Sequence, residues 1–434
     1  MTDTLIRNRP CELSAVDAAK AIAAGQLTSE GLVKSCLERI EERDADVQAW
    51  AWLDTAHALE QARAADAGPV SGPLHGVPVA LKDIIDAYGM PTGFNSTIYP
   101  GYIPDADSAC AALIRKSGGI ILGKTVTTEF ANRHPGPTRN PLDPERTPGG
   151  SSQGSAAAVA DFQVPLSIGT QTSGSIIRPA AYCGVVGYKP SFGEVSRVGV
   201  KEQSGSLDTL GLIGRSTGDV ELLRAVVTGI PYEPVAPSGF GITVALCRPP
   251  EWNKATAEAR ADIEETAELF RAEGAEVVEL DLPTELFGEW LNDHRRIANF
   301  EASRNFAHEK THHADKISKA LWEGRIVDGA RCPIEDYIAS QRKAERMRAW
   351  MDERFEGFDT ILTLSTAGEA TVGLADTGSA TFNSLWTLLY TPCISLPSGK
   401  GPAGLPLAVQ LVGRRFEDEK LFAIASSLEH ALKG

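Results

Sequence analysis

The sequence lacks the features that mark secreted or membrane-embedded chains. Its 434 residues include seven cysteines, which are scattered along the chain and form no Cys-x-x-Cys pair. An odd, dispersed set of this kind indicates reduced thiols rather than a disulfide framework. No apolar run approaches the roughly 20 residues that a membrane span requires, and residues 1–10 contain no apolar signal core. We therefore expect a cytoplasmic protein without a membrane partner.

An excess of basic residues is also missing. The chain has 42 Lys and Arg against 57 Asp and Glu, so its formal net charge at pH 7 is −15. Nucleic acids and anionic membranes attract basic surfaces, because Lys and Arg neutralise their phosphates. On this ground we expect no nucleic-acid partner, whereas a small-molecule substrate fits the composition and a homodimer is left open.

What is present is the composition of an ordinary globular protein, with 42% hydrophobic and 23% charged residues. The length suffices for two average domains, although large α/β folds often form one unit. We expect a single domain over residues 1–434. Within it, we place a catalytic core at 68–230 and a mainly helical excursion at 285–357.

Apolar segments of strand length alternate with helical patterns in the core region. This alternation predicts an α/β fold, an α/β/α sandwich whose mixed or largely parallel central sheet is covered by helices on both faces. The predicted strands are 77–82, 119–123, 164–169, 241–247, 275–280 and 359–364, and the predicted helices include 108–117, 152–160, 217–228 and 417–432.

Two segments rich in glycine and serine, 149–155 and 169–175, follow an apolar strand that ends in Lys82. A serine hydroxyl is a weak nucleophile until a neighbouring base takes its proton. A lysine can be that base when apolar surroundings disfavour its charged form and lower its pKa. Val79, Ala80 and Leu81 give Lys82 such a setting, so nucleophile and base are present without a histidine.

These segments resemble the amidase signature family, whose hydrolases use a Ser–cis-Ser–Lys triad. The resemblance implies that Lys82 is the base, that Ser151 is the relay serine on a cis peptide bond after Gly150, and that Ser175 is the nucleophile. It also implies amide hydrolysis with no cofactor and no metal. The segments that carry the resemblance are 76–83, 123–131, 140–152, 169–175, 182–190, 392–397 and 404–413.

The resemblance also implies a mechanism. Neutral Lys82 accepts a proton from Ser151, which accepts one from Ser175 as that oxygen attacks a carbonyl carbon. The resulting acyl-enzyme is then hydrolysed by water. The oxyanion hole is expected from backbone N–H groups, each worth roughly 3–4 kcal/mol in the transition state. These groups belong to Thr172, Ser173, Gly174 and Ser175.

Three positions beside the nucleophile depart from the family form Gly-Thr-Asp-Thr-Gly-Gly-Ser-Ile-Arg. Gln171 replaces the acid and Ile177 the arginine, with Arg178 one place later, and Ser173 replaces a glycine. Losing both charges together suggests that a buried ion pair was exchanged for neutral packing, which costs little. These changes bear on the substrate more than on the triad.

A second motif, His308-Glu309-x-x-His312, fits the zinc-protease pattern His-Glu-x-x-His, and His313 follows it. On a helix the two histidines of the motif share one face. The surrounding residues, Lys310 among them, are strongly polar, which suits a solvated helix better than a sheltered metal cavity. We expect no metal chemistry here.

The acyl pocket is expected from residues 381–391. Trp386, Leu389 and Tyr390 in this segment suggest an apolar or aromatic substrate, although the same apolar stripe is equally consistent with helix packing.

Three functions remain open. The first is a stand-alone serine amidohydrolase that cleaves an amide or carbamate C–N bond, with urethanase, anilide and ester hydrolysis as related activities. The second is the amidase (glutaminase) subunit of a tRNA-dependent amidotransferase, which would need charged groups for an amino-acid substrate. The third is an inactive binding protein on the same scaffold, and the intact Lys82, Ser151 and Ser175 argue against it.

Overall fold

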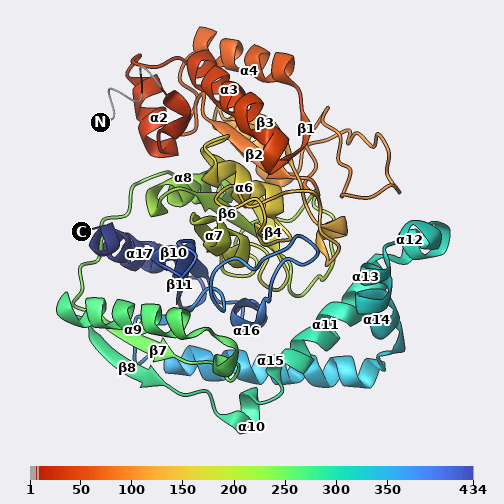
Figure 1. Ribbon diagram of the computed structural model, residues 1–434, viewed down its shortest axis with the longest axis vertical. Coiled ribbons are helices and arrows are strands. Elements are labelled where there is room, and N and C mark those ends of the chain that lie inside the picture. Colours follow the sequence, from red (N-terminus) through yellow and green to blue (C-terminus); the bar gives the residue numbers. More distant parts are fainter. Residues whose placement is uncertain (1–5, 7–8, 434) are drawn as a thin grey trace.

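One continuous sheet of 11 strands runs through the computed structural model, which describes residue 6 and residues 9–433 (Figure 1). Its strand order is β1-β3-β2-β4-β6-β5-β10-β11-β9-β7-β8. The strands are β1 (Trp50–Leu53), β2 (Pro78–Lys82), β3 (Ile120–Thr125), β4 (Leu166–Gln171), β5 (Val186–Lys189), β6 (Thr209–Gly214), β7 (Thr243–Cys247), β8 (Glu276–Leu280), β9 (Thr360–Leu364), β10 (Cys393–Lys400) and β11 (Pro406–Val412).

The sheet is mixed, as predicted. Strand β2 lies parallel to β3 and β4, and β7 lies parallel to β8 and β9. The other neighbouring pairs are antiparallel. Every residue of β2 and of β4 is buried, which is typical of strands covered on both faces. The prediction of an α/β sandwich is therefore confirmed.

Helices flank the sheet, and several begin at a residue whose side chain caps the first turn. Ser108 accepts a hydrogen bond from the N–H of Ala111, and Ser216 accepts one from Asp219. The flanking helices are α2 (Ala15–Ala23), α3 (Ser29–Val47), α4 (Thr55–Ala67), α5 (Ala109–Lys116), α6 (Gln153–Ala160), α7 (Ile177–Cys183), α8 (Thr217–Thr228), α9 (Ala257–Ala272), α16 (Thr381–Leu388) and α17 (Asp418–Lys433).

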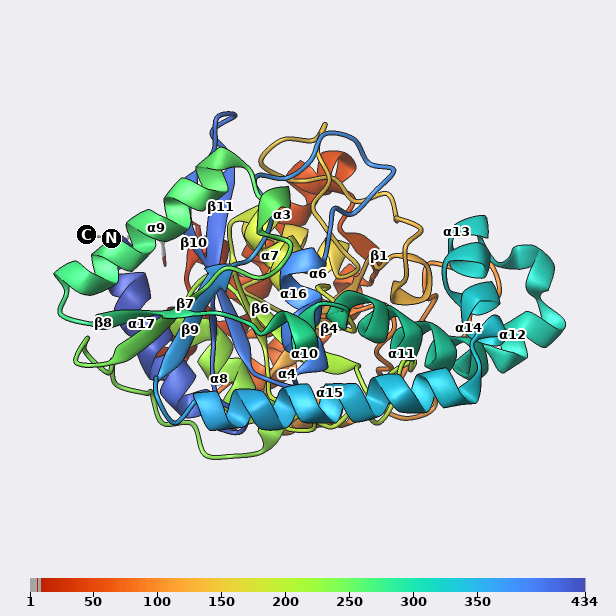
Figure 2. The same ribbon diagram turned by 90° about the horizontal axis from the view of Figure 1, so that it is seen from below.

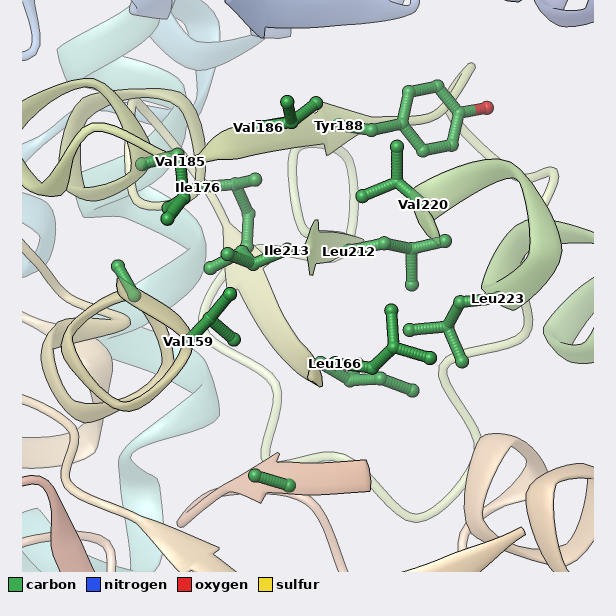
Figure 3. Packing of buried hydrophobic residues seen from close by; sticks show 14 of the residues in the cluster. Val159, Leu166, Ile176, Val185, Val186, Tyr188, Leu212, Ile213, Val220 and Leu223 are labelled. Carbon is green, nitrogen blue, oxygen red and sulfur yellow. The ribbon is translucent and has the colours of Figure 1, made fainter. Parts of the chain in front are cut away.

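Apolar side chains from α6 and α8 hold the middle of the sheet. In Figure 3, Val159 of α6 and Leu223 of α8 lie on either side of the strands that carry Leu166 and Leu212. All four side chains are buried, and truncating such a leucine to alanine typically costs about 2–5 kcal/mol. This packing fixes β4, whose carboxyl end leads directly into the segment with Ser175.

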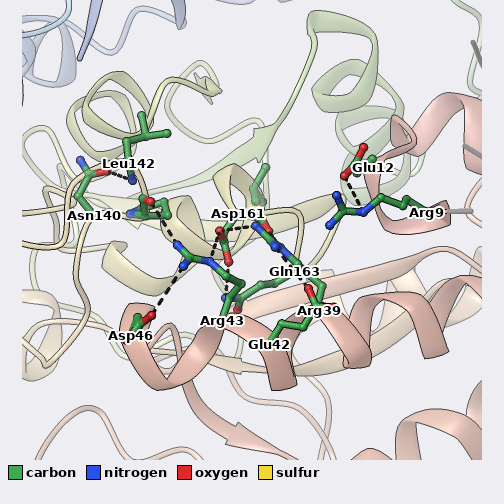
Figure 4. Close-up of polar contacts among 12 residues, drawn as sticks. Arg9, Glu12, Arg39, Glu42, Arg43, Asp46, Asn140, Leu142, Asp161 and Gln163 are labelled. Atoms are coloured by element: carbon green, nitrogen blue, oxygen red, sulfur yellow. Dashed lines mark hydrogen bonds and ion pairs between the residues drawn. The ribbon is translucent and has the colours of Figure 1, made fainter. Parts of the chain in front are cut away.

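A buried ion pair fastens α3 to the end of α6 (Figure 4). Asp161 follows α6 and is 4% exposed. Its Oδ1 accepts from Arg39 Nη2 at 2.9 Å and from Arg43 Nε at 3.3 Å, and its Oδ2 accepts from Gln163 Nε2 at 3.0 Å. These donors satisfy both carboxylate oxygens, so the N-terminal helices are held against the core.

A helical segment, residues 284–354, connects β8 with β9, in the region where an excursion at 285–357 is predicted. Figure 2 shows α15 lying along α11, with α12, α13 and α14 gathered at one end of the pair. The segment contains α10 (Thr284–Phe287), α11 (Trp290–Asn305), α12 (Ala307–His312), η4 (Ala314–Lys316), α13 (Lys319–Leu321), η5 (Trp322–Val327), α14 (Asp328–Arg331) and α15 (Ile334–Arg354). Whether it is a subdivision of one domain stays a prediction.

All seven cysteines are free, and six of them are buried. Within the described ranges, none of the helices combines the length and apolar character needed to cross a membrane. Residues 1–5 and 7–8, which belong to the segment 1–10 on which the expectation of a missing signal core rests, lie outside the described residues.

Candidate active site

Lys82 is the last residue of β2 and points toward the serine-rich loops. Its Nζ lies 2.7 Å from Ser151 Oγ and 2.8 Å from Thr170 Oγ1. The register explains this contact, because Leu81 of β2 pairs with Ile168 of the parallel strand β4. The carboxyl ends of the two strands therefore meet, and they bring a lysine and a threonine together.

The Lys82 side chain is fully buried, and its pKa is well below the ordinary value for lysine. Burial is the main cause, because it disfavours the charged amine. The cation of Arg178 lowers the pKa further, and Asp208 opposes the shift. Among the described residues, no carboxylate forms an ion pair with Lys82. The neutral amine is thus favoured.

Ser151 lies where the chain enters α6, and the Gly150–Ser151 peptide bond is cis. The serine is 2% exposed. The buried guanidinium of Arg178 supports this turn, because its Nη2 donates to Gly150 O at 2.5 Å and to Thr377 Oγ1 at 3.1 Å. Arg178 is a positioning residue that the sequence did not reveal.

Ser175 lies in the loop between β4 and α7 and lines a cavity of about 380 Å³. Within the described part of the chain, the backbone N–H groups of Ser173, Gly174 and Ser175 donate to no other residue. A Cβ on Gly174 would collide with Asn383 Oδ1, so only glycine fits there. The loop therefore presents unpaired donors next to the serine, as an oxyanion hole requires.

Two contacts hold this loop from outside. Thr172 Oγ1 donates to Asp208 Oδ1 at 2.6 Å, and Thr172 O lies 3.0 Å from His294 Nε2 of α11. His294 is buried, and burial lowers its pKa to about 4. Because the imidazole is then neutral, it donates to the carbonyl without adding a charge. Thr172 and His294 are 122 residues apart, so no local pattern could reveal the contact.

The departures beside the nucleophile have clear structural roles. Gln171 Oε1 accepts from the N–H groups of Ile176 at 2.8 Å and Ile177 at 3.1 Å, and its Nε2 donates to Thr387 Oγ1 at 3.0 Å. The Ile177 side chain packs in an apolar cluster. Neutral groups thus occupy both positions, and the amide of Gln171 satisfies the first turn of α7.

The three residues expected to bind substrate do not line this cavity. Trp386 and Leu389 are each 1% exposed and belong to an apolar cluster, and Tyr390 stacks on Phe192 with a centroid distance of 4.2 Å. Helix α16 does border the cavity, but through Thr381 and Ser384. The apolar face of α16 packs inward, so the helix-packing interpretation of the stripe applies and the expectation of an apolar pocket is corrected.

The His-Glu-x-x-His motif has another role in the structure. The Glu309 carboxylate is buried and accepts from Lys201 Nζ at 2.5 Å and from Tyr99 OH at 2.6 Å, which ties α12 to the core. The His308 and His312 rings have centroids 4.9 Å apart. Among the described residues, no group of three or more His, Cys, Asp or Glu side chains is arranged to hold a metal. That the motif carries no metal chemistry stays a prediction.

Comparison with known proteins identifies the family. The family model described as Amidase matches residues 31–422. A glutamyl-tRNA(Gln) amidotransferase subunit of Anaeromyxobacter sp. (strain K) is 35% identical, and the match covers 97% of this chain and 96% of the relative. The corresponding protein of Streptomyces coelicolor is 33% identical, with 97% and 96% covered.

Solved structures agree with this relationship. The crystal structure of an amidase superimposes with a TM-score of 0.88 at 30% identity, covering 96% of this chain and 99% of the other. The peptide amidase from Stenotrophomonas maltophilia superimposes with a TM-score of 0.84 at 28% identity, covering 98% and 97%. Both neighbours match nearly the whole chain, which supports the α/β fold assigned above.

These relatives contradict the expectation that nucleic acid is no partner. The curated relatives are named as subunits of an enzyme that acts on a glutamyl-tRNA, and they match nearly the full length of this chain. The error lies in the use of net charge. A value of −15 averages over the whole surface, and it does not describe what one chain meets within an assembly.

Proposed function

This chain belongs to the amidase family, and we propose that it hydrolyses the C–N bond of a small amide or carbamate through an acyl-enzyme on Ser175. The coarse activity, that of an amidohydrolase, follows from the family. The catalytic roles and the substrate class are proposed from the site, and the polar lining of the cavity favours a polar substrate.

One observation carries this proposal, namely the contact between the buried amine of Lys82 and the hydroxyl of Ser151. A buried lysine that forms no ion pair with a carboxylate releases its proton readily, because burial disfavours its charge more than the nearby Asp208 favours it. It can then act as a general base, which needs a pKa near the working pH. An ordinary structural lysine would be paired or solvated.

The proposed reaction begins with attack of Ser175 Oγ on the carbonyl carbon. Its proton passes to Ser151, and the proton of Ser151 passes to Lys82 Nζ. The developing oxyanion accepts hydrogen bonds from the free N–H groups of the 173–175 loop. The tetrahedral intermediate collapses as the proton returns along the relay to the leaving nitrogen, and an amine departs. Water then attacks the acyl-enzyme by the same route and releases the acid.

A substrate panel tests this proposal. Purified protein is assayed with primary amides, p-nitroanilides and carbamates, and acid-quenched samples are analysed by peptide mass spectrometry. We expect turnover of at least one class and a transient acyl group on the peptide that contains Ser175. An acyl group on another residue would contradict the assignment of the nucleophile.

A second candidate function is that of the glutaminase component of a tRNA-dependent amidotransferase. Two observations favour it: the relatives with this name match nearly the whole chain, and the cavity carries arginines as well as Asp376. Those charges suit the carboxylate and the ammonium of an amino acid. Ammonia release from glutamine, compared with release from simple primary amides, separates the two candidates.

A further inference from the structure

Four arginines line the cavity that contains Ser175, and one of them, Arg178, already donates to the backbone oxygens of Gly150 and Gly378. The other three come from separate segments. Arg133 follows the short helix η2 (Glu129–Ala131), Arg295 belongs to α11, and Arg325 belongs to η5. The latter two lie in the helical segment 284–354, so this segment supplies two of the four arginines that line the cavity.

None of the three arginines forms an ion pair with any described residue. Arg325 donates only to neutral oxygens, namely Asn132 Oδ1 at 3.1 Å and Asn299 Oδ1 at 3.2 Å. Elsewhere Arg224 is paired with Glu194 at 2.5 Å, whereas the buried Arg178 also donates only to neutral oxygens. Arg133 and Arg295 are exposed, whereas Arg325 is partly buried, and a partly desolvated cation is costly unless it is paired.

The three cations are also close enough to disfavour one another. The side chain of Arg133 lies beside Gly324, the residue that precedes Arg325. A Cβ atom added to Gly324 would be 3.7 Å from Arg133 Nη1. The pKa of Arg325 is lowered to about 10, first by burial and then by the charge of Arg133, and Arg295 contributes in the same direction, while Asp208 opposes the shift. An anion in the cavity would remove this repulsion.

The only acidic side chain that lines the cavity, within the described residues, is Asp376. Its Oδ1 already accepts from Gly378 N at 2.5 Å, and it forms no ion pair with the three arginines. The cavity therefore keeps an excess of positive charge. Its volume of about 380 Å³ limits the ligand to a small molecule.

From these observations, and resting on the proposed function, we propose that the substrate is a small amide or carbamate with a free carboxylate, which Arg133, Arg295 and Arg325 bind while its carbonyl lies at Ser175. Guanidinium groups suit this role, because their planar donors match the two oxygens of a carboxylate. The proposal gives the helical segment a function in substrate selection.

Matched substrates test the proposal by activity. The monoamides succinamate and glutaramate are compared with their methyl esters, which keep the amide and lose the charge. We expect kcat/KM for the acids to exceed that for the esters by about tenfold or more, as a lost charged hydrogen bond predicts. The variants Arg295→Gln and Arg325→Gln should abolish this preference, because they lower kcat/KM for the acids far more than for the esters. Arg271→Gln, on the exposed side of α9, is the matched control.

Binding tests the proposal without turnover. Titration of Ser175→Ala with succinate, followed by calorimetry, should show binding that Arg295→Gln weakens by about tenfold and that added salt also weakens. Arg133→Gln provides an exposed alternative should the partly buried Arg325 be needed for folding. Because this readout needs no reaction, it remains informative even if Ser175 is not the nucleophile.

Two results would overturn the proposal. One is equal or faster hydrolysis of the neutral esters by the wild type. The other is a loss in the arginine variants that is the same for acids and esters, together with unchanged succinate binding. Persistent turnover in Ser175→Ala would instead refute the proposed function, and the binding titration would still decide the role of the arginines.

Discussion

The two sides of the cavity, which we call the floor and the wall, differ in how burial affects their cationic side chains. The floor consists of strand ends and the loops that follow them. Ser175 lines the cavity there, and Lys82 contacts the neutral hydroxyls of Ser151 and Thr170. The wall comes largely from the helical segment 284–354 and presents Arg295 and Arg325. The chemistry and the selection of substrate are thus assigned to different parts of the fold.

Lys82 and Arg325 make the contrast sharp, because both are cations whose pKa is lowered by burial. Lysine starts near 10.4, so a large decrease brings its neutral form into the working range. Arginine starts higher, and at a pKa of about 10 Arg325 stays charged at neutral pH. The same physical effect therefore produces a base on the floor and a fixed cation on the wall.

The largest expected effect is at the floor. We predict that Ser175→Ala lowers turnover by several orders of magnitude for charged and neutral substrates alike, because it removes the nucleophile. The fold should be unaffected, since the side chain only lines the cavity. The measurement is kcat/KM for both substrate types, with circular dichroism to check folding. A fluorophosphonate probe should label wild type at Ser175, and a fully active variant would refute the assignment.

The next effect concerns the base. We predict that Lys82→Arg is almost inactive although it keeps the charge, because arginine does not release its proton at working pH. Lys82→Ala should also lose most of its rate while KM changes less. Only the neutral amine accepts a proton, so kcat/KM of the wild type should fall as the pH drops through the lowered pKa of Lys82.

The check is a pH profile of kcat/KM for the wild type and both variants. Lys116→Arg, at the exposed end of α5, is the control for the lysine-to-arginine change itself. Near-normal activity of Lys82→Arg with an unchanged profile would mean that Lys82 is structural and that the base lies elsewhere.

Much of the floor can be predicted from sequence, because local patterns encode it. The buried strand before Lys82 and the glycine-rich segment before Ser175 are contiguous, and the predicted strand 164–169 lies within two residues of β4. The patterns do not reveal strands β5 and β6 individually. Both are short, and their pairing across the sheet depends on partners far away in the chain.

The wall could not be predicted, because its residues come together only in the folded chain. Arg133 and Arg325 are almost 200 positions apart in the sequence and look like ordinary surface arginines there. The helix at 381–388 does border the site, but the expectation that its apolar face does so is wrong. The hydrophobic character of Trp386 leads to its prediction as a substrate contact. Its burial in the core accounts for that character instead.

His294 joins the wall to the floor, and a smaller effect is expected there. Its pKa is about 4 in the folded protein and about 6.5 when unfolded. The unfolded state therefore binds more protons between these values, so stability falls as the pH decreases through this window. From pH 7 to 5 the loss amounts to about 2 kcal/mol.

The variant His294→Gln should lack this part of the pH dependence, because it has no group that titrates there. Urea unfolding at pH 7 and pH 5 measures it, with the exposed His308→Gln as the matched control. If the difference between the two pH values is the same in His294→Gln and in wild type, the buried neutral imidazole is not the cause.

The smallest effect is predicted for the outer end of the helical segment. His308 and His312 lie on α12, outside the set of residues that line the cavity with Ser175. The carboxylate between them is held by Lys201 and Tyr99 and is not free to act as a base. We therefore expect the double variant His308→Ala/His312→Ala, and treatment of the wild type with EDTA, to leave kcat/KM unchanged.

Glu309→Gln provides the contrast, because it breaks a buried ion pair and should cost about 3–5 kcal/mol of stability. A stoichiometric zinc whose removal stops the reaction would reverse this expectation, and it would place part of the chemistry on the wall.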